Sequence, residues 1–205
     1  MESDLQFNVL DVMWKPYEDT PGLEHLRLTI EPSGSVADGL VIGEWDGEPF
    51  RLRYLVRCDE QWHTRELLCE MLRLSADQTP GPALHLLADG AGQWTTAAGE
   101  PLPDLDGCLD VDIMATPFTN TLPIRRLNLP SGASQQIAVV YVALPDLKVS
   151  RMEQRYICRE RQTSEGGYAG KYGYESVESG FTATLAVNED GLVRDYPQLY
   201  AWVWP

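Results

Sequence analysis

Period-two alternation of apolar and polar residues is the feature that most constrains the fold of this chain. It is clearest in residues 25–30 and returns in residues 51–57, 108–113 and 181–187. A β-strand points successive side chains to opposite faces of its sheet, so this alternation gives each strand one core face and one polar face. The pattern predicts a chain dominated by β-strands.

Turn signals between these segments indicate how the strands connect. Asp46-Gly47, Asp89-Gly90 and Asp190-Gly191 are typical of tight hairpins, because glycine adopts the positive φ that such turns need. Residues 66–74 suit a helix or a strand, and we expect a strand. Residues 122–127 are expected to form a short helix, because Pro123 suits a first helical turn. The sequence therefore predicts an all-β, mainly antiparallel fold with at most one or two short helices, in one domain over residues 1–205.

The charge balance limits the partners of the protein. Acidic residues outnumber basic ones by 31 to 16, which gives a formal net charge of −15. Such a surface repels phosphate backbones, so we expect no nucleic-acid partner. No apolar run reaches the roughly 20 residues that span a bilayer, and the first dozen residues do not resemble a signal peptide. We expect no stable membrane insertion and a cytoplasmic location.

Cysteine and histidine spacing argues against a metal site or a cofactor. The cysteines contain no CxxC pair, and no histidine approaches a cysteine at zinc-finger spacing. We expect buried thiols, no metal and no cofactor. The residues concerned are Cys58, Cys69, Cys108, Cys158, His25, His63 and His85.

Two carboxylates share one face of the strand predicted over residues 108–113. Asp110 and Asp112 are separated by two strand rises, or about 6.8 Å between Cα atoms. Inverting glycosidases hold their acid and base about 6.5–9.5 Å apart, so the pair could hydrolyse a glycosidic or lipid ester bond. The alternatives are a solvated strand face, or ion pairs with Arg125 and Arg126.

A polar loop follows that strand. Thr119, Asn120 and Thr121 surround a phenyl ring, a mixture that can bond sugar hydroxyls beside an apolar surface. The next charged residues, Arg125 and Arg126, could grip a carboxylate or phosphate in a bidentate manner. They could equally lock the loop by bonding backbone carbonyls or Asp106.

Aromatic residues are the remaining clue. Six tryptophans and nine tyrosines are spread along the chain, and most of them are expected in the core. An aromatic ring in a groove would suit acyl chains and sugar rings. The glycine- and tyrosine-rich residues 164–174 lack the Gly-Lys-Ser/Thr ending of a phosphate-binding loop, so we expect a flexible hairpin loop there.

Residues 105–113 and 116–127 together resemble the Putative glycolipid-binding family of bacterial proteins. Residues 54–62, the pair Gln154 and Tyr156, and residues 191–197 support this resemblance. It implies a many-stranded sheet wound into an open roll, similar to the half-barrel carriers that shuttle lipoproteins and lipids across the bacterial periplasm. It also implies a glycolipid-like ligand.

We therefore expect a protein that binds an amphiphilic molecule, such as a glycolipid or fatty-acid derivative, in the groove of a curved sheet. The leading interpretation has no catalytic residue; the hydrolase that uses Asp110 and Asp112 is the alternative. A non-catalytic structural or interaction module is a third reading, favoured if side chains fill the groove. A homodimer formed through an exposed sheet edge is left open. The candidate ligand-binding residues are Trp62, Asp106, Asp110, Asp112, Thr119, Asn120, Thr121, Arg125, Arg126, Gln154, Tyr156 and Tyr196.

Overall fold

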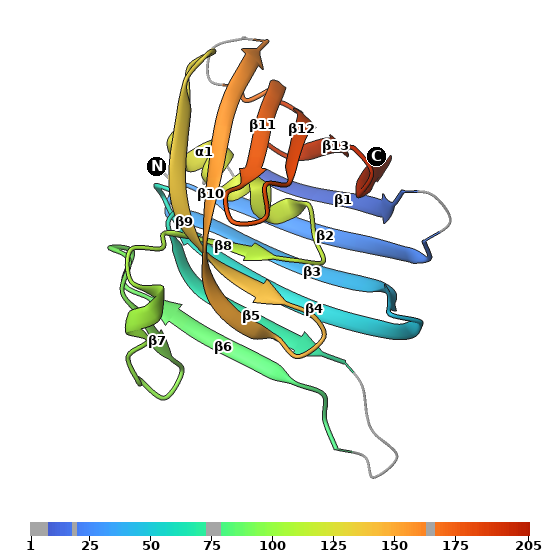
Figure 1. The fold of residues 1–205 in the computed structure, drawn as a ribbon, viewed down its shortest axis with the longest axis vertical. Coiled ribbons are helices and arrows are strands. Elements are labelled where there is room, and N and C mark those ends of the chain that lie inside the picture. The colour runs from blue at the N-terminus through green and yellow to red at the C-terminus, as the bar shows by residue number, and fades with distance from the viewer. Residues whose placement is uncertain (1–7, 18–19, 73–78, 163–166) are drawn as a thin grey trace, which may run out of the picture.

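The computed structural model describes residues 8–17, 20–72, 79–162 and 167–205, and in them most regular structure is β-strand. The strands form one large curved sheet that is not closed into a barrel (Figure 1). This confirms the predicted all-β, open and mainly antiparallel fold.

The sheet has two halves that meet where the first and last strands pair. Its order runs from β7 back to β1, then across to β14 and back to β8. The first half contains β1 (Asn8–Pro16), β2 (Gly22–Glu31), β3 (Gly34–Trp45), β4 (Glu48–Asp59), β5 (Thr64–Met71), β6 (Ala83–Ala88) and β7 (Trp94–Thr96). The second contains β8 (Asp110–Ile113), β9 (Ser134–Ala143), β10 (Lys148–Arg161), β11 (Gly170–Ser176), β12 (Thr182–Val187), β13 (Val193–Tyr196) and β14 (Tyr200–Trp204).

The predicted hairpin turns fall between antiparallel strands. Asp46 and Gly47 join β3 to β4 with φ of 53° and 82°, the two positive values of a turn that matches strand twist. Asp89-Gly90 lies between β6 and β7, and Asp190-Gly191 between β12 and β13. The strand expected over residues 66–74 is present as β5, which ends at Met71; residues 73–74 lie outside the described part. The loop expected over residues 164–174 is wrong for residues 170–174, which belong to β11 because they pair with β10 and β12, and its residues 164–166 lie outside the described part.

Strand β8 departs from the antiparallel rule. It pairs with β9 in parallel, because the chain passes through the 3₁₀ turn η2 (Phe118–Asn120) and the helix α1 (Thr121–Leu127) before β9 begins. Another 3₁₀ turn, η1 (Pro103–Leu105), precedes it. Just before β8 begins, the Leu109 carbonyl accepts a hydrogen bond from the Thr64 amide of β5 at 2.9 Å, which ties this edge of the sheet to β5. The short helix expected over residues 122–127 is α1.

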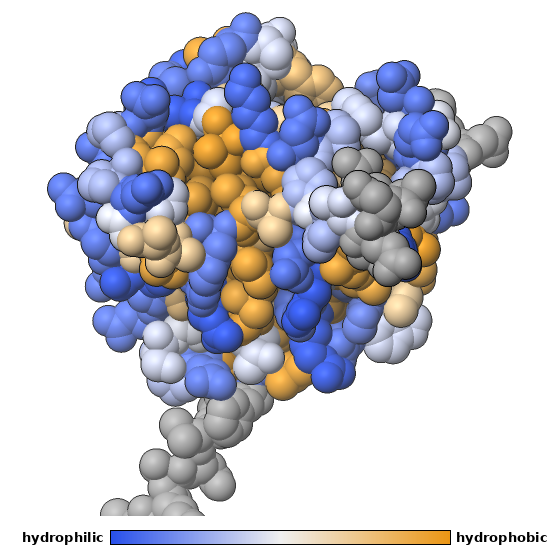
Figure 2. All heavy atoms as spheres, turned by 90° about the horizontal axis from the view of Figure 1, so that it is seen from below, coloured by the Kyte–Doolittle hydropathy of each residue, from blue (hydrophilic) through white to orange (hydrophobic). Residues whose placement is uncertain are grey.

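The inner side of the curve holds the core. Inward side chains of β1 to β6 pack against β8, η2 and α1, whose contributions include Val111, Phe118 and Leu122. A second cluster joins the C-terminal strands to α1 through Ile124. The four cysteines are free and buried, as expected. Figure 1 shows α1 and β8 within the curve, and Figure 2 shows apolar side chains at the centre of one open face with hydrophilic ones around them.

Helix α1 contains seven residues. In the portions of the chain that the structure describes, no helix is both long enough and apolar enough to cross a membrane.

Candidate functional site

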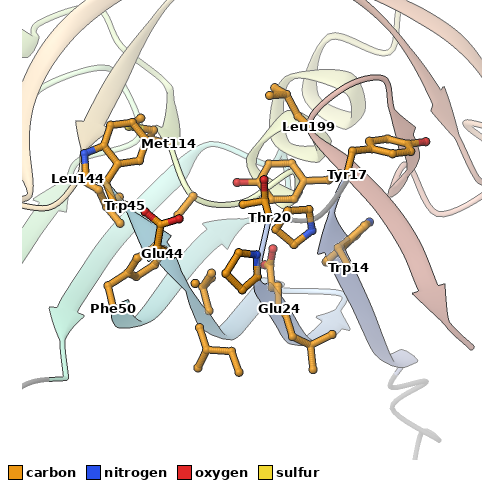
Figure 3. A pocket seen from close by; sticks show the side chains of 18 of the residues that line it. Trp14, Tyr17, Thr20, Glu24, Glu44, Trp45, Phe50, Met114, Leu144 and Leu199 are labelled. Carbon is orange, nitrogen blue, oxygen red and sulfur yellow. The ribbon is translucent and has the colours of Figure 1, made fainter. Parts of the chain in front are cut away.

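Two adjoining cavities lie on the inner side of the sheet. We call the first the apolar chamber; it has a volume of about 230 Å³ and is walled by β1 to β4, the segment after β8, and residues 198–200. Figure 3 shows how Trp14, Phe50, Leu144 and Leu199 surround it. Its walls are therefore mostly aromatic and aliphatic.

The second cavity, the polar chamber, has a volume of about 500 Å³. It shares Trp45, Met114, Leu199 and Tyr200 with the apolar chamber, so the two form one groove. Most of the lining surface is apolar in both chambers, and polar side chains are more numerous in the walls of the second. Ligand sites are commonly about 300–1,000 Å³, so the pair can hold a small molecule. Polar groups that line the polar chamber include Asp112, Thr116, Asn120, Tyr141, Ser176 and Tyr196.

A buried glutamate lies where the two chambers meet. The Glu24 side chain lines the apolar chamber and is 2% exposed. Its Oε1 accepts hydrogen bonds from the Tyr54 hydroxyl at 2.5 Å and from Thr116 Oγ1 at 2.6 Å, and Thr116 lines the polar chamber. Burial raises the pKa of Glu24 to about 7, although these two bonds act in the opposite direction.

Glycine at position 39 makes this arrangement sterically feasible. A Cβ atom at Gly39 would lie 2.1 Å from Cζ of Tyr54, so the tyrosine ring lies across the glycine on the neighbouring strand. This position brings the phenol to Glu24 across β3. Glu24 is not among the residues predicted for the site, although the sequence contains a signal for it. The glutamate stands in phase with the buried Leu26 and Leu28 rather than with the polar face of β2.

Five of the predicted site residues form one hydrogen-bond network at the polar chamber. Thr119 Oγ1 donates to Asp112 Oδ1 at 3.1 Å, and Gln154 Nε2 donates to Asp112 Oδ2 at 2.6 Å. The Tyr156 hydroxyl donates to Asn120 Oδ1 at 2.9 Å and lies 3.4 Å from Gln154 Oε1, which joins the two groups. Burial raises the pKa of Asp112, and the bonds from Gln154 and Thr119 act against that rise. The network fixes the polar wall, which Tyr196 extends from β13.

The other strand carboxylate has a different environment. Asp110 is fully buried, and Arg126 donates to it from Nε at 3.1 Å to each oxygen and from Nη2 at 2.5 Å to Oδ2. Burial raises the pKa of Asp110, while the Arg126 hydrogen bonds and charge lower it. A solvated strand face is therefore wrong for Asp110, and an ion pair with one of the arginines is what the structure contains.

Arg125 connects helix α1 to three loops, those between β4 and β5, β10 and β11, and β12 and β13. Its guanidinium carbon lies 4.1 Å from the ring centroid of Trp62 and 5.0 Å from that of Tyr168. Its Nη1 donates to the Asp190 carbonyl at 2.5 Å, and burial lowers its pKa. These contacts match the expected locking role of the arginine, which stands outside the walls of both chambers.

The remaining predicted residues are not at the groove. Asp106 is exposed in the turn after η1, whereas Thr121 is buried at the start of α1. Neither residue lines a chamber. Among the residues that the structure describes, no group of three or more His, Cys, Asp or Glu side chains is placed to hold a metal ion.

The model of the family described as "Putative glycolipid-binding" matches residues 11–201. A DUF1089 family protein from Pseudomonas aeruginosa, known from its crystal structure, is 39% identical, with a TM-score of 0.75 over 90% of this chain and 93% of that one. The comparison with curated proteins found no match. The match over residues 11–201 shows that this chain belongs to the Putative glycolipid-binding family.

Proposed function

We propose that the protein binds a glycolipid-like amphiphile, with its tail in the apolar chamber and its head group in the polar chamber. The observation that carries this proposal is the shared wall of the two chambers, because one molecule can reach from one chamber into the other and place its polar end among the more numerous polar side chains of the second. The family description points to the same ligand class.

The apolar chamber supplies the affinity in this proposal. Burial of each ligand CH₂ contributes about 0.8 kcal/mol. Aromatic walls such as Trp14 and Phe50 offer flat surfaces that suit an alkyl chain. The binding free energies of ligands that differ only in chain length should therefore differ by about 0.8 kcal/mol for each CH₂.

The polar chamber supplies selectivity for the head group. Asn120, Ser176 and Tyr141 present amide and hydroxyl groups that can bond sugar hydroxyls. The Asp112 oxygens each accept one bond within the protein, and a carboxylate oxygen has room for a second. Arg125 and Arg126 are engaged elsewhere, so the head group in this proposal is recognised without an arginine fork.

Hydrolysis is less well supported than binding. An acid–base pair of Asp110 and Asp112 would need both carboxyls free to exchange protons with a substrate. Asp110 is instead held by three hydrogen bonds from Arg126 and lines neither chamber. Binding requires no such access to Asp110.

We also propose a cytoplasmic location. Four cysteines that remain free and buried suit a reducing compartment, where thiols persist without pairing. Fractionation of cells that produce the native protein should recover it with cytoplasmic markers; recovery with periplasmic or membrane fractions would contradict this.

Isothermal titration calorimetry with decyl glucoside, octyl glucoside and glucose, all as monomers in solution, tests the binding proposal. Two extra CH₂ groups are worth about 1.6 kcal/mol, so decyl glucoside should bind roughly tenfold more tightly than octyl glucoside, and glucose far more weakly. Absence of binding by both glycosides would contradict the proposal.

Two tryptophan variants locate the site. Trp45 lines both chambers and is 44% exposed, whereas Trp204 is 49% exposed and lines neither. Trp45→Ala should weaken decyl glucoside binding about tenfold, because the substitution removes part of one aromatic wall. Trp204→Ala is the matched control and should leave affinity unchanged; equal losses in both variants would place binding elsewhere.

A further inference from the structure

The groove is acidic and has no basic counterpart in its walls. The described residues that line the two chambers include four carboxylates and no Lys, Arg or His side chain. The carboxylates are Glu24, Glu44, Asp112 and Glu178. A negative head group would meet repulsion there, whereas a positive group would be attracted.

Glu24 has unused bonding capacity at this place. Its Oε1 accepts two hydrogen bonds, whereas its buried Oε2 has no hydrogen-bond partner. A buried carboxylate oxygen without a donor is costly, and a ligand N–H can remove that cost. Figure 3 shows the Glu24 side chain among those that surround the apolar chamber.

The aromatic side chains around Glu24 favour the same kind of ligand. Trp14, Trp45, Phe50 and Tyr200 line the chamber that Glu24 lines. The faces of aromatic rings attract cations, more strongly where water is excluded. A carboxylate together with aromatic faces is a common way to recognise an alkylammonium group.

We infer that the groove selects amphiphiles with a protonated amino group close to the point where tail and head group join, and that Glu24 is the counter-ion. This inference rests on the proposed function, and it specifies the ligand class. The amino group is placed at this junction because Glu24, which lines the apolar chamber, is hydrogen-bonded to Thr116, which lines the polar chamber.

The surroundings of Glu24 make the selection dependent on pH. Tyr54 on β4, Tyr200 on β14 and Thr116 face it, and Glu44 lies at the end of β3 on the same chamber. Burial raises the pKa values of both tyrosines, so they stay neutral near pH 7. Glu24, with a pKa of about 7, gains its charge between pH 6 and pH 8.

Three probes with one tail and different head groups test the inference: decylamine, decanol and decanoate. The ionised fraction of Glu24 rises from about one-tenth at pH 6 to about nine-tenths at pH 8, for a pKa of about 7. Decylamine remains protonated throughout, so its affinity should rise about tenfold over this interval. Decanol affinity should change little, and decanoate should bind most weakly at pH 8.

Glu24→Gln gives the matched variant, because an amide oxygen can still accept the bonds from Tyr54 and Thr116. It should abolish the rise in decylamine affinity and retain decanol binding. Glu31→Gln, an exposed position on the same strand, should behave as wild type. If Glu24→Gln does not fold, the pH profile of the wild-type protein still decides the matter.

The outcomes separate this inference from the proposed function. Binding of decanol and decyl glucoside without a preference for decylamine at pH 8 would overturn the inference alone. An unchanged pH profile in a folded Glu24→Gln protein would do the same. Failure of all three probes and of decyl glucoside would overturn both.

Discussion

Replacement of Arg126 by methionine should destabilise the fold far more than replacement of an exposed arginine. Arg126 and Asp110 have side-chain exposures of 12% and 0%, and three hydrogen bonds join them. Arg126→Met keeps most of the side-chain length but leaves a buried carboxylate without its partner. Loss of one member of a buried pair costs about 3–5 kcal/mol, much of it from the abandoned charge.

Arg53 supplies the matched control. It makes two hydrogen bonds to Asp38, at 3.3 and 3.2 Å, but both side chains are 47% exposed. An exposed ion pair contributes about 1 kcal/mol or less, so Arg53→Met should lower the free energy of unfolding by no more than that. Urea unfolding at pH 7, followed by tryptophan fluorescence, measures both variants on the same scale.

The pH dependence provides a second readout. The Asp110 pKa is already raised by burial, and the loss of Arg126 removes the main influence that lowers it. An acid whose folded-state pKa is raised loses stability as pH rises through that value. The loss of unfolding free energy in Arg126→Met, relative to wild type, should therefore be largest at neutral pH and shrink as acid protonates Asp110. Equal destabilisation by Arg126→Met and Arg53→Met, or a deficit that does not vary with pH, would refute this reasoning.

Other predictions concern Glu24 and the tyrosine that contacts it. Gly39→Ala should cost about 1–3 kcal/mol, because its Cβ would lie 2.1 Å from the Tyr54 ring; Gly43→Ala, at 3.0 Å from the Phe50 ring, should cost less in the same urea experiment. Glu24 should make the wild-type protein about 3 kcal/mol less stable as pH rises from 4.5 through 7, since its pKa shifts from 4.5 to about 7. Glu24→Gln lacks that titration, so its free energy of unfolding should fall less over the same interval; parallel curves would contradict the raised pKa.

The sequence predicts the strands well, because period two and the Asp-Gly turns are local signals. Residues 51–57 and 25–30 fall within β4 and β2, where buried side chains alternate with more exposed ones through residues 51–57 and from His25 to Leu28. The parallel pairing of β8 was not predictable in this way. It depends on where η2 and α1 place the chain, which is a property of the tertiary fold.

The candidate site was predictable in part. The strand carboxylate Asp112, the polar loop with Thr119 and Asn120, and the pair Gln154 and Tyr156 were all predicted as site residues, and these five form the hydrogen-bond network. Sequence spacing could not separate the roles of Asp110 and Asp112, because the difference lies in Arg126, 16 residues away from Asp110 in the chain. The apolar chamber combines segments from opposite ends of the sequence, as in Trp14 and Leu199, and no local pattern joins them.

The most direct test of the proposed function is the position of a bound amphiphile. A crystal of the complex with an alkyl glucoside that carries a bromine atom at the tail end would locate the tail by anomalous scattering. We predict the bromine in the apolar chamber, within contact distance of Phe50 or Leu23, and the sugar in the polar chamber near Asn120 and Tyr141. Bromine on the outer face of the sheet, or a sugar outside the polar chamber, would contradict the proposed binding mode.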